Sequence, residues 1–255
     1  MAERFTRAPG ATPIGAPAGP PPRRSGLLER ARRQPSAILL VTQLFGVLIY
    51  PFLGESRAGT SAVSVFGLLV LALAVWSVET TAWTVWVSIV LGVPAVIFTI
   101  CQVISEASAW RAWGSGFEAA FYFYAAGSLI SYMLADRTIT RDELFAVGAT
   151  FTLLAWAFAH LYTVTQVIWP GSFVAAVNSG SPRSWMELLF LSFTTLSSTG
   201  LSDVVPVRPH ARSFVMIEQV AGLAYVAMIV SWMVGLTVAR ARGRAEHPES
   251  ADDLN

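Results

Sequence analysis

Six apolar runs constrain the fold of this chain more than any other feature, because each is close to the length of a membrane-spanning helix. A helix rises about 1.5 Å per residue, so about 20 apolar residues cross the hydrocarbon core of a bilayer. In chain order the runs are Ala37–Leu53, Ser61–Val78, Ala82–Ile104, Phe117–Leu134, Leu144–Ile168 and Phe214–Val238. They predict an all-α membrane protein with six transmembrane helices.

The composition agrees with lipid as the solvent of these runs. Of the 255 residues, 54% are hydrophobic and 13% are charged, whereas a soluble domain carries about 25% charged residues. One soluble core of this size cannot hide so much apolar surface, so the lipid bilayer is the predicted partner. The net charge of +1 gives no reason to expect nucleic acid. Cys101 is the only cysteine, which excludes an intrachain disulfide and gives no support to a zinc site.

The arginines set the predicted orientation. All 17 basic residues are Arg, and cytoplasmic segments of membrane proteins are enriched in Lys and Arg. With six spans and the N-terminus inside, twelve Arg lie inside and five outside. Both the Pro-, Gly- and Arg-rich segment 1–36, which we expect to be disordered, and the short tail 239–255 are therefore predicted to be cytoplasmic. Arg-only usage with abundant Ala and Val is typical of a high-GC bacterial genome, so the plasma membrane of a bacterium is the expected location.

A shorter apolar stretch, Trp185–Leu196, lies between the last two runs. About a dozen residues cannot span a bilayer, so this stretch is predicted to be a re-entrant helix that opens to the outside. It is the first part of the segment Trp185–Pro206, W-M-E-L-L-F-L-S-F-T-T-L-S-S-T-G-L-S-D-V-V-P, in which hydroxyl residues precede Gly200 and Asp203. Backbone carbonyls at the C-terminal end of a short helix can replace the hydration shell of a cation. Hydroxyls add oxygen ligands, and Gly permits the backbone twist.

This stretch and the runs on either side resemble the pore domain of prokaryotic potassium channels, in which two helices flank a pore helix and a T-T-V-G-Y-G-D filter. Aligned without gaps, Ser197–Asp203 takes the place of that filter, and the resemblance covers roughly residues 144–238. It implies a pore domain over residues 137–238, with an outer helix, a pore helix and filter, and an inner helix. The preceding region, 37–136, is predicted to be a four-helix membrane region of unknown role.

The resemblance implies a role for each residue of the loop. The residues that would line the ion path are Ser198, Thr199, Gly200, Leu201 and Ser202. The residues that would support the filter or form its mouth are Asp203, Thr194, Thr195, Ser197 and Glu218. The candidate hinges of the inner helix are Gly222 and Gly235. The alternatives are a turn cap for Asp203, an interfacial snorkelling side chain for Glu218, and close helix contacts for the two glycines.

Two residues depart from the family motif: Leu201 replaces its Tyr, and Ser202 replaces its second Gly. Alternate filter residues in the family take left-handed backbone conformations, where a non-Gly residue costs roughly 1–2 kcal/mol. We therefore expect a distorted outer filter at Ser202 and weaker selection of potassium over sodium. Ser198, Gly200 and Asp203 would keep the inner ion sites intact.

The other polar residues in or near the spans predict no further chemistry. In the fifth run, we expect His160, Thr163 and Gln166 to make hydrogen bonds between helices. At the edges of spans, we expect interfacial positions for Glu79, Glu106 and Glu118. The fourth run lacks the Arg ladder of a voltage sensor. No nucleophile–base pair, HExxH, Walker or Rossmann pattern occurs, so we predict no enzyme, no catalytic residue, no cofactor and no metal other than a permeant ion.

One pore loop cannot surround an ion, so the sequence predicts a homotetramer with four loops around a central pore. The expected function is a passive monovalent cation channel that conducts potassium, with sodium as the second candidate ion. The alternative is a non-conducting membrane scaffold or regulatory subunit on the same fold. Ion flux distinguishes the two hypotheses.

Overall fold

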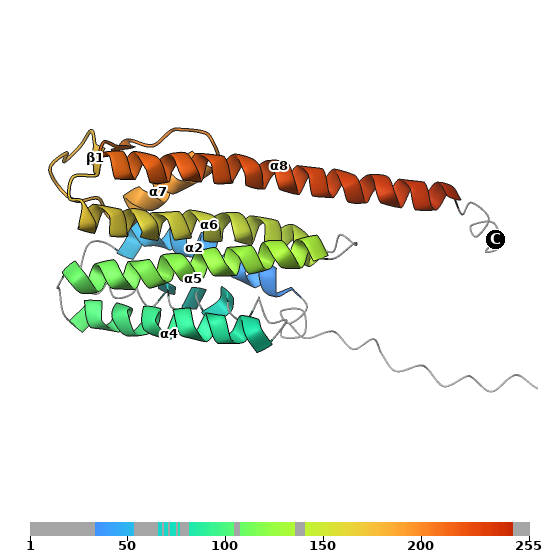
Figure 1. Cartoon of the computed structure of the whole chain (residues 1–255), viewed down its shortest axis with the longest axis horizontal. Coiled ribbons are helices and arrows are strands. Elements are labelled where there is room, and N and C mark those ends of the chain that lie inside the picture. The colour runs from blue at the N-terminus through green and yellow to red at the C-terminus, as the bar shows by residue number, and fades with distance from the viewer. Residues whose placement is uncertain are drawn as a thin grey trace, which may run out of the picture.

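A computed structural model of the chain describes residues 34–53, 66–67, 69–70, 72–74, 76, 82–104, 108–135 and 141–246. This part of the chain is mostly helical (Figure 1). Its helices are α2 (Pro35–Leu53), α4 (Ala82–Ile104), α5 (Ser108–Ala135), α6 (Arg141–Ile168), α7 (Trp185–Leu196) and α8 (Pro209–Glu246). Its two short strands are β1 (Phe173–Ala175) and β2 (Val204–Pro206).

Among the residues that the structure describes, three helices are long and apolar enough to cross a membrane. They are Pro35–Leu53, Asp142–Ile168 and Pro209–Val238, and Trp86–Cys101 and Trp185–Leu196 are shorter apolar helices. The prediction of a helical membrane protein is thus confirmed, and the count of six spans stays a prediction. The run at 61–78 lies mostly outside the described residues, as do Glu79, Glu106, most of the N-terminal segment and the last nine residues.

Two helices extend well beyond their predicted bounds. α5 begins at Ser108, ahead of the predicted apolar run. Its first turns contain Trp110, Arg111 and Trp113, whose polar groups suit the end of a membrane helix. Arg111 interrupts the apolar pattern from which the run was predicted. α8 begins at Pro209, where the fixed φ of proline suits the first helical position. It continues to Glu246, so the predicted tail starts as a helix.

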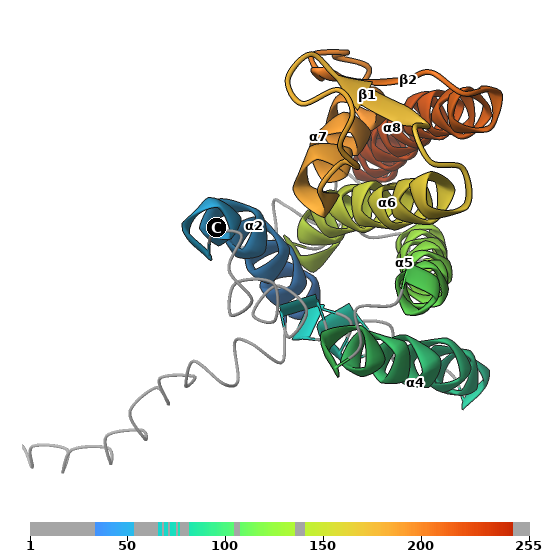
Figure 2. The ribbon, with the colours of Figure 1, turned by 90° about the vertical axis from the view of Figure 1, so that its left-hand side faces the viewer.

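α6 is the central helix of the bundle. It packs against α5 and α2, and also against α7 and α8, while α4 packs against α5. Seen end-on, α7 and α8 lie on one side of α6, and α5 and α4 on the other (Figure 2). In the most apolar part of α6, 56% of the residues are buried, whereas 17% are buried in the corresponding parts of α2 and α8. A series of buried alanines on α6 lets its neighbours approach closely: Ala149, Ala155, Ala157 and Ala159.

The strands β1 and β2 fix both ends of the segment that contains α7. They pair antiparallel, with Val174 opposite Val205, and the Val207 amide also donates to the Ser172 carbonyl at 2.9 Å. The chain therefore leaves α6, runs through α7, and returns beside its own starting point before α8 begins.

Candidate functional site

α7 begins with a capping box. The Glu187 amide donates to Ser184 Oγ at 3.3 Å, and the Ser184 amide donates to the Glu187 carboxylate at 2.6 Å. Both amides would otherwise lack a partner at the start of the helix. The helix then buries an apolar face that includes Leu188 and Leu191. This local sequence explains why a 12-residue helix holds a defined position beside α6 and α8.

Arg183 anchors the loop ahead of α7, a role that the sequence analysis missed. Its side chain is only 3% exposed. The guanidinium donates to the Val177 carbonyl at 3.2 Å and pairs with Glu187 at 3.2 Å. The side chain of Gln166, on α6, holds both the amide and the carbonyl of Arg183, at 2.9 and 2.8 Å. Gln166 was expected to bridge helices, and it secures this loop instead.

After α7 the chain folds back onto the end of the helix. The Thr194 carbonyl accepts hydrogen bonds from the amides of Thr199 and Gly200, at 2.9 and 3.1 Å, and from the Thr199 hydroxyl at 3.2 Å. The Ser198 amide donates to the Thr195 carbonyl at 3.0 Å. These contacts satisfy the carbonyls that a helix end leaves free. Thr194 and Thr195 are buried, and they support the loop through their backbones.

The backbone of the loop alternates in hand. Ser198 has φ 60° and Gly200 has φ 66°. Alternating right- and left-handed residues turn successive N–H groups toward one side, and here the amides of Thr199 and Gly200 both donate to the Thr194 carbonyl. In the described part of the chain, no hydrogen bond reaches the carbonyl oxygens of Ser198 through Leu201. These residues are exposed in the protomer, so their carbonyl oxygens are available to a cation.

The strained non-glycine residue is not where the sequence predicted it. Among the described residues Ser202 is not one of those with positive φ, whereas Ser198 is. Ser202 instead accepts a hydrogen bond from the Val204 amide at 3.1 Å, a local side-chain turn that serine favours. The expectation of strain at Ser202 was therefore wrong, and the cost of about 1–2 kcal/mol for a left-handed residue falls on Ser198.

Glu218 joins three helices behind α7. It is fully buried, which contradicts the alternative of a snorkelling side chain. Its carboxylate accepts hydrogen bonds from Tyr162 on α6 and from Ser192 on α7. Ser192 Oγ also lies 2.8 Å from the Ala155 carbonyl. Neither Tyr162 nor Ser192 is predictable from the sequence, because nothing local to either residue marks it as a partner of Glu218.

The two candidate hinges have different surroundings. A Cβ on Gly222 would overlap the backbone carbonyl of Leu196, with the carbonyl carbon at 2.8 Å. A Cβ on Gly235 would meet nothing within 4 Å. Gly222 therefore lets α8 approach the end of α7, whereas Gly235 has open space around it in the protomer.

Two further members of the predicted site lie at the surface of the protomer. Asp203 is exposed, and in the described part of the chain its carboxylate makes no hydrogen bond or ion pair. Ser197 is also exposed, and its hydroxyl donates to the Phe193 carbonyl at 2.6 Å. The structure thus places Asp203 at the end of the loop away from α7 and Ser197 at the junction with α7.

A second polar cluster lies among α4, α5 and α6. Glu118 Oε2 is 2.9 Å from His160 Nδ1, and the Thr99 hydroxyl donates to Glu118 Oε1 at 2.9 Å. The contact of His160 between helices is confirmed. The neighbouring helices supply polar partners for Glu118 that the sequence could not show, and its interfacial position stays a prediction. Thr163 donates to the Ala159 carbonyl of its own helix at 3.0 Å, so its expected contact between helices was wrong.

Comparison with known proteins gave one match. Residues 149–238 match the family described as ion channel. Neither the curated proteins nor the solved structures contain a match to the chain. The matched segment begins in α6 and ends in α8, so it contains α7, the loop after it and Glu218. The predicted resemblance of this segment is thereby confirmed.

Proposed function

We propose that this chain, whose residues 149–238 match the ion channel family, forms a passive channel for monovalent cations, with potassium as the main permeant ion. Four copies would surround one pore. The protein would lie in the plasma membrane of a bacterium, with both termini in the cytoplasm.

The single observation that carries the proposal is the arrangement of the loop after α7. The amides of Thr199 and Gly200 donate to the Thr194 carbonyl. With positive φ at Ser198 and Gly200, the carbonyl oxygens of the loop accept no hydrogen bond in the described part of the chain. Carbonyl oxygens that replace a hydration shell are how potassium filters bind their ion. The C-terminal end of α7 adds the negative end of its helix dipole at the same place.

The assembly follows from the geometry of one loop. One loop cannot surround an ion, so several loops are needed to enclose it. α8 leaves many large apolar side chains exposed, among them Met216, Val220 and Leu223. These side chains are available to neighbouring copies and to lipid. A ring of Asp203 carboxylates would then lie at the outer mouth, where it would concentrate cations.

The choice between potassium and sodium depends on the outer half of the filter. Leu201 is 77% exposed, and the Ser202 hydroxyl holds the Val204 amide. In the proposed filter neither residue reproduces the Tyr and Gly of the potassium motif. We expect fewer ion sites in series, and therefore weaker preference for potassium over sodium.

The proposal is tested by purifying the protein, determining its assembly by native mass spectrometry, and measuring flux in liposomes with potassium or sodium as the only permeant cation. We expect a tetramer that passes potassium with some sodium. The double variant Leu201→Tyr with Ser202→Gly should raise the preference for potassium. A monomer would remove the pore, and a tetramer that passes neither ion would favour the scaffold or regulatory subunit.

A further inference from the structure

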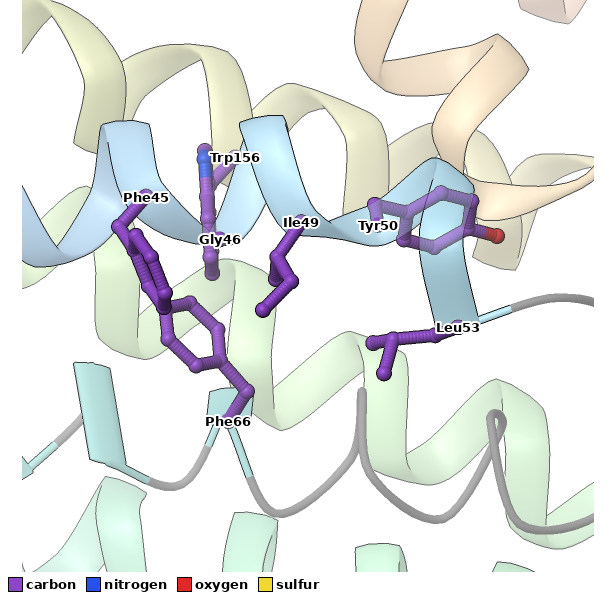
Figure 3. Close-up of a pocket in the computed structure, with 7 residues that line it drawn as sticks. All are labelled: Phe45, Gly46, Ile49, Tyr50, Leu53, Phe66 and Trp156. Atoms are coloured by element: carbon purple, nitrogen blue, oxygen red, sulfur yellow. The ribbon is translucent and has the colours of Figure 1, made fainter.

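An apolar cavity lies between α2 and α6, away from the proposed ion path. Its volume is about 160 Å³. It is lined by five residues of α2 together with Phe66 and Trp156 (Figure 3): Phe45, Gly46, Ile49, Tyr50 and Leu53. A Cβ on Gly46 would overlap the Phe66 ring, so glycine at this position lets Phe66 form one wall.

The lining fits an apolar occupant. None of the seven lining residues is charged, and the cavity surface is almost entirely apolar. An apolar cavity of about 150 Å³ stays dry and takes up hydrocarbon in a soluble protein. The indole nitrogen of Trp156 is buried without a hydrogen-bond partner, and the Tyr50 hydroxyl points away from it (Figure 3). The lining therefore does not offer the two to four polar partners that a water needs.

The position of the cavity gives it access to lipid. α2 is a candidate membrane span of which only a small part is buried. Phe45, at the cavity, is 53% exposed, and Leu48, on the same turn as Ile49, is 70% exposed. In a bilayer the molecules next to these side chains are acyl chains. Filling the cavity costs such a chain no dehydration, and it restores the dispersion contacts that an empty space would lose.

The cavity also contacts the start of α7. The Trp156 and Trp185 rings meet edge-to-face with centroids 5.1 Å apart, and the Tyr50 and Trp185 rings lie 6.1 Å apart. Trp185 is the first residue of α7, the helix whose other end holds the filter loop. Trp156 therefore joins the cavity to α7, because it lines the cavity and packs on the first residue of that helix.

We propose that this cavity binds an acyl chain of a bilayer phospholipid, and that the bound chain sets the position of α7 through Trp156, Tyr50 and Trp185. The binding is independent of ion conduction. The effect on α7 becomes a regulation of flux, and that part rests on the proposed channel function.

Binding is tested in liposomes that contain a trace of phosphatidylcholine with a photoreactive diazirine in its acyl chain. After irradiation, mass spectrometry locates the adducts. Because Trp156 is buried, bulk lipid does not reach it, and an adduct there reports occupancy of the cavity. Ile49→Trp fills the cavity and should lower the Trp156 adduct at least fivefold, with Ile49→Phe as a smaller second variant. Leu48→Trp, on the exposed face of the same turn, should leave it unchanged.

Equal labelling of Trp156 in wild type and both Ile49 variants, or no labelling in wild type, would overturn the binding site. Labelling of Trp156 by a photoreactive free fatty acid but not by the phospholipid would overturn the choice of occupant. Potassium flux tests the second half: Ile49→Trp should differ from Leu48→Trp at least threefold. Lost labelling with unchanged flux would refute the action on α7. Absence of flux from the wild type would refute the channel function and leave the labelling result standing.

Discussion

Replacement of Glu218 tests whether its buried carboxylate stabilises the contact of α6, α7 and α8. Glu218→Ala removes the acceptor of two buried hydrogen bonds, from Tyr162 and Ser192. Ser192 keeps an alternative acceptor, because the Ala155 carbonyl lies 2.8 Å from its hydroxyl. Tyr162 is fully buried and keeps none among the described contacts. Leaving a buried polar group unpaired costs about 1–3 kcal/mol, and the cavity adds to this, so we expect a loss of about 3 kcal/mol.

Glu218→Gln should lower the free energy of unfolding much less than Glu218→Ala does. The amide oxygen can accept from Tyr162, and the amide nitrogen can donate to Ser192 Oγ while the Ser192 hydroxyl donates to the Ala155 carbonyl. All polar groups then keep partners. We expect a loss of at most about 1 kcal/mol. Both variants should be compared by equilibrium unfolding in mixed detergent, together with potassium flux in liposomes.

Gln219→Ala is the matched control, because Gln219 is the next residue on α8 and is exposed in the protomer. A surface substitution changes stability by about 0.5 kcal/mol or less. If Glu218→Ala unfolds within that margin of Gln219→Ala, the three-helix contact does not stabilise the fold. If Glu218→Gln is as unstable as Glu218→Ala, the pairing deduced for the amide is wrong.

Two further predictions concern the contact of α7 with α8 and the orientation of the chain in the membrane. Gly222→Ala should destabilise the protein by about 1–3 kcal/mol, because the new Cβ would overlap the Leu196 carbonyl. Gly235→Ala is the control and should not lower stability in thermal unfolding. Equal effects of the two substitutions would contradict the close contact of α7 and α8. A membrane-impermeant thiol reagent should label Ser179→Cys from outside intact cells, in a background of Cys101→Ser; labelling only after permeabilisation would reverse the orientation predicted from Arg placement.

Helix lengths were predictable because the bilayer imposes them. An apolar run near 20 residues has few alternatives in lipid, and α2, α6 and the apolar part of α8 follow their runs closely. The start of α5 was missed because Arg111 interrupts the apolar pattern without interrupting the helix. The strands β1 and β2, of three residues each, carry too little periodicity to be recognised.

The candidate site was predictable where the chemistry is local. Gly200 and the hydroxyls around it form a continuous motif, and the structure gives Gly200 the positive φ that a glycine there permits. The partners of Glu218 were not predictable, because Tyr162 lies 56 positions away and only the packing of α6 on α8 brings the two together. The choice between Ser198 and Ser202 as the strained residue depended on a hydrogen bond to Val204, which a motif alignment does not contain.

Potassium flux through Gly200→Ala tests the central claim most directly. Gly200 has φ 66° and nothing near its missing Cβ in the protomer, so alanine there is strained by about 1–2 kcal/mol and would place a methyl group beside the ion path. Gly180→Ala is the control, because Gly180 also has open space around it but no positive φ. We expect Gly200→Ala to lower potassium flux at least tenfold and Gly180→Ala to conduct as the wild type does. Wild-type flux through Gly200→Ala would show that this loop is not the filter.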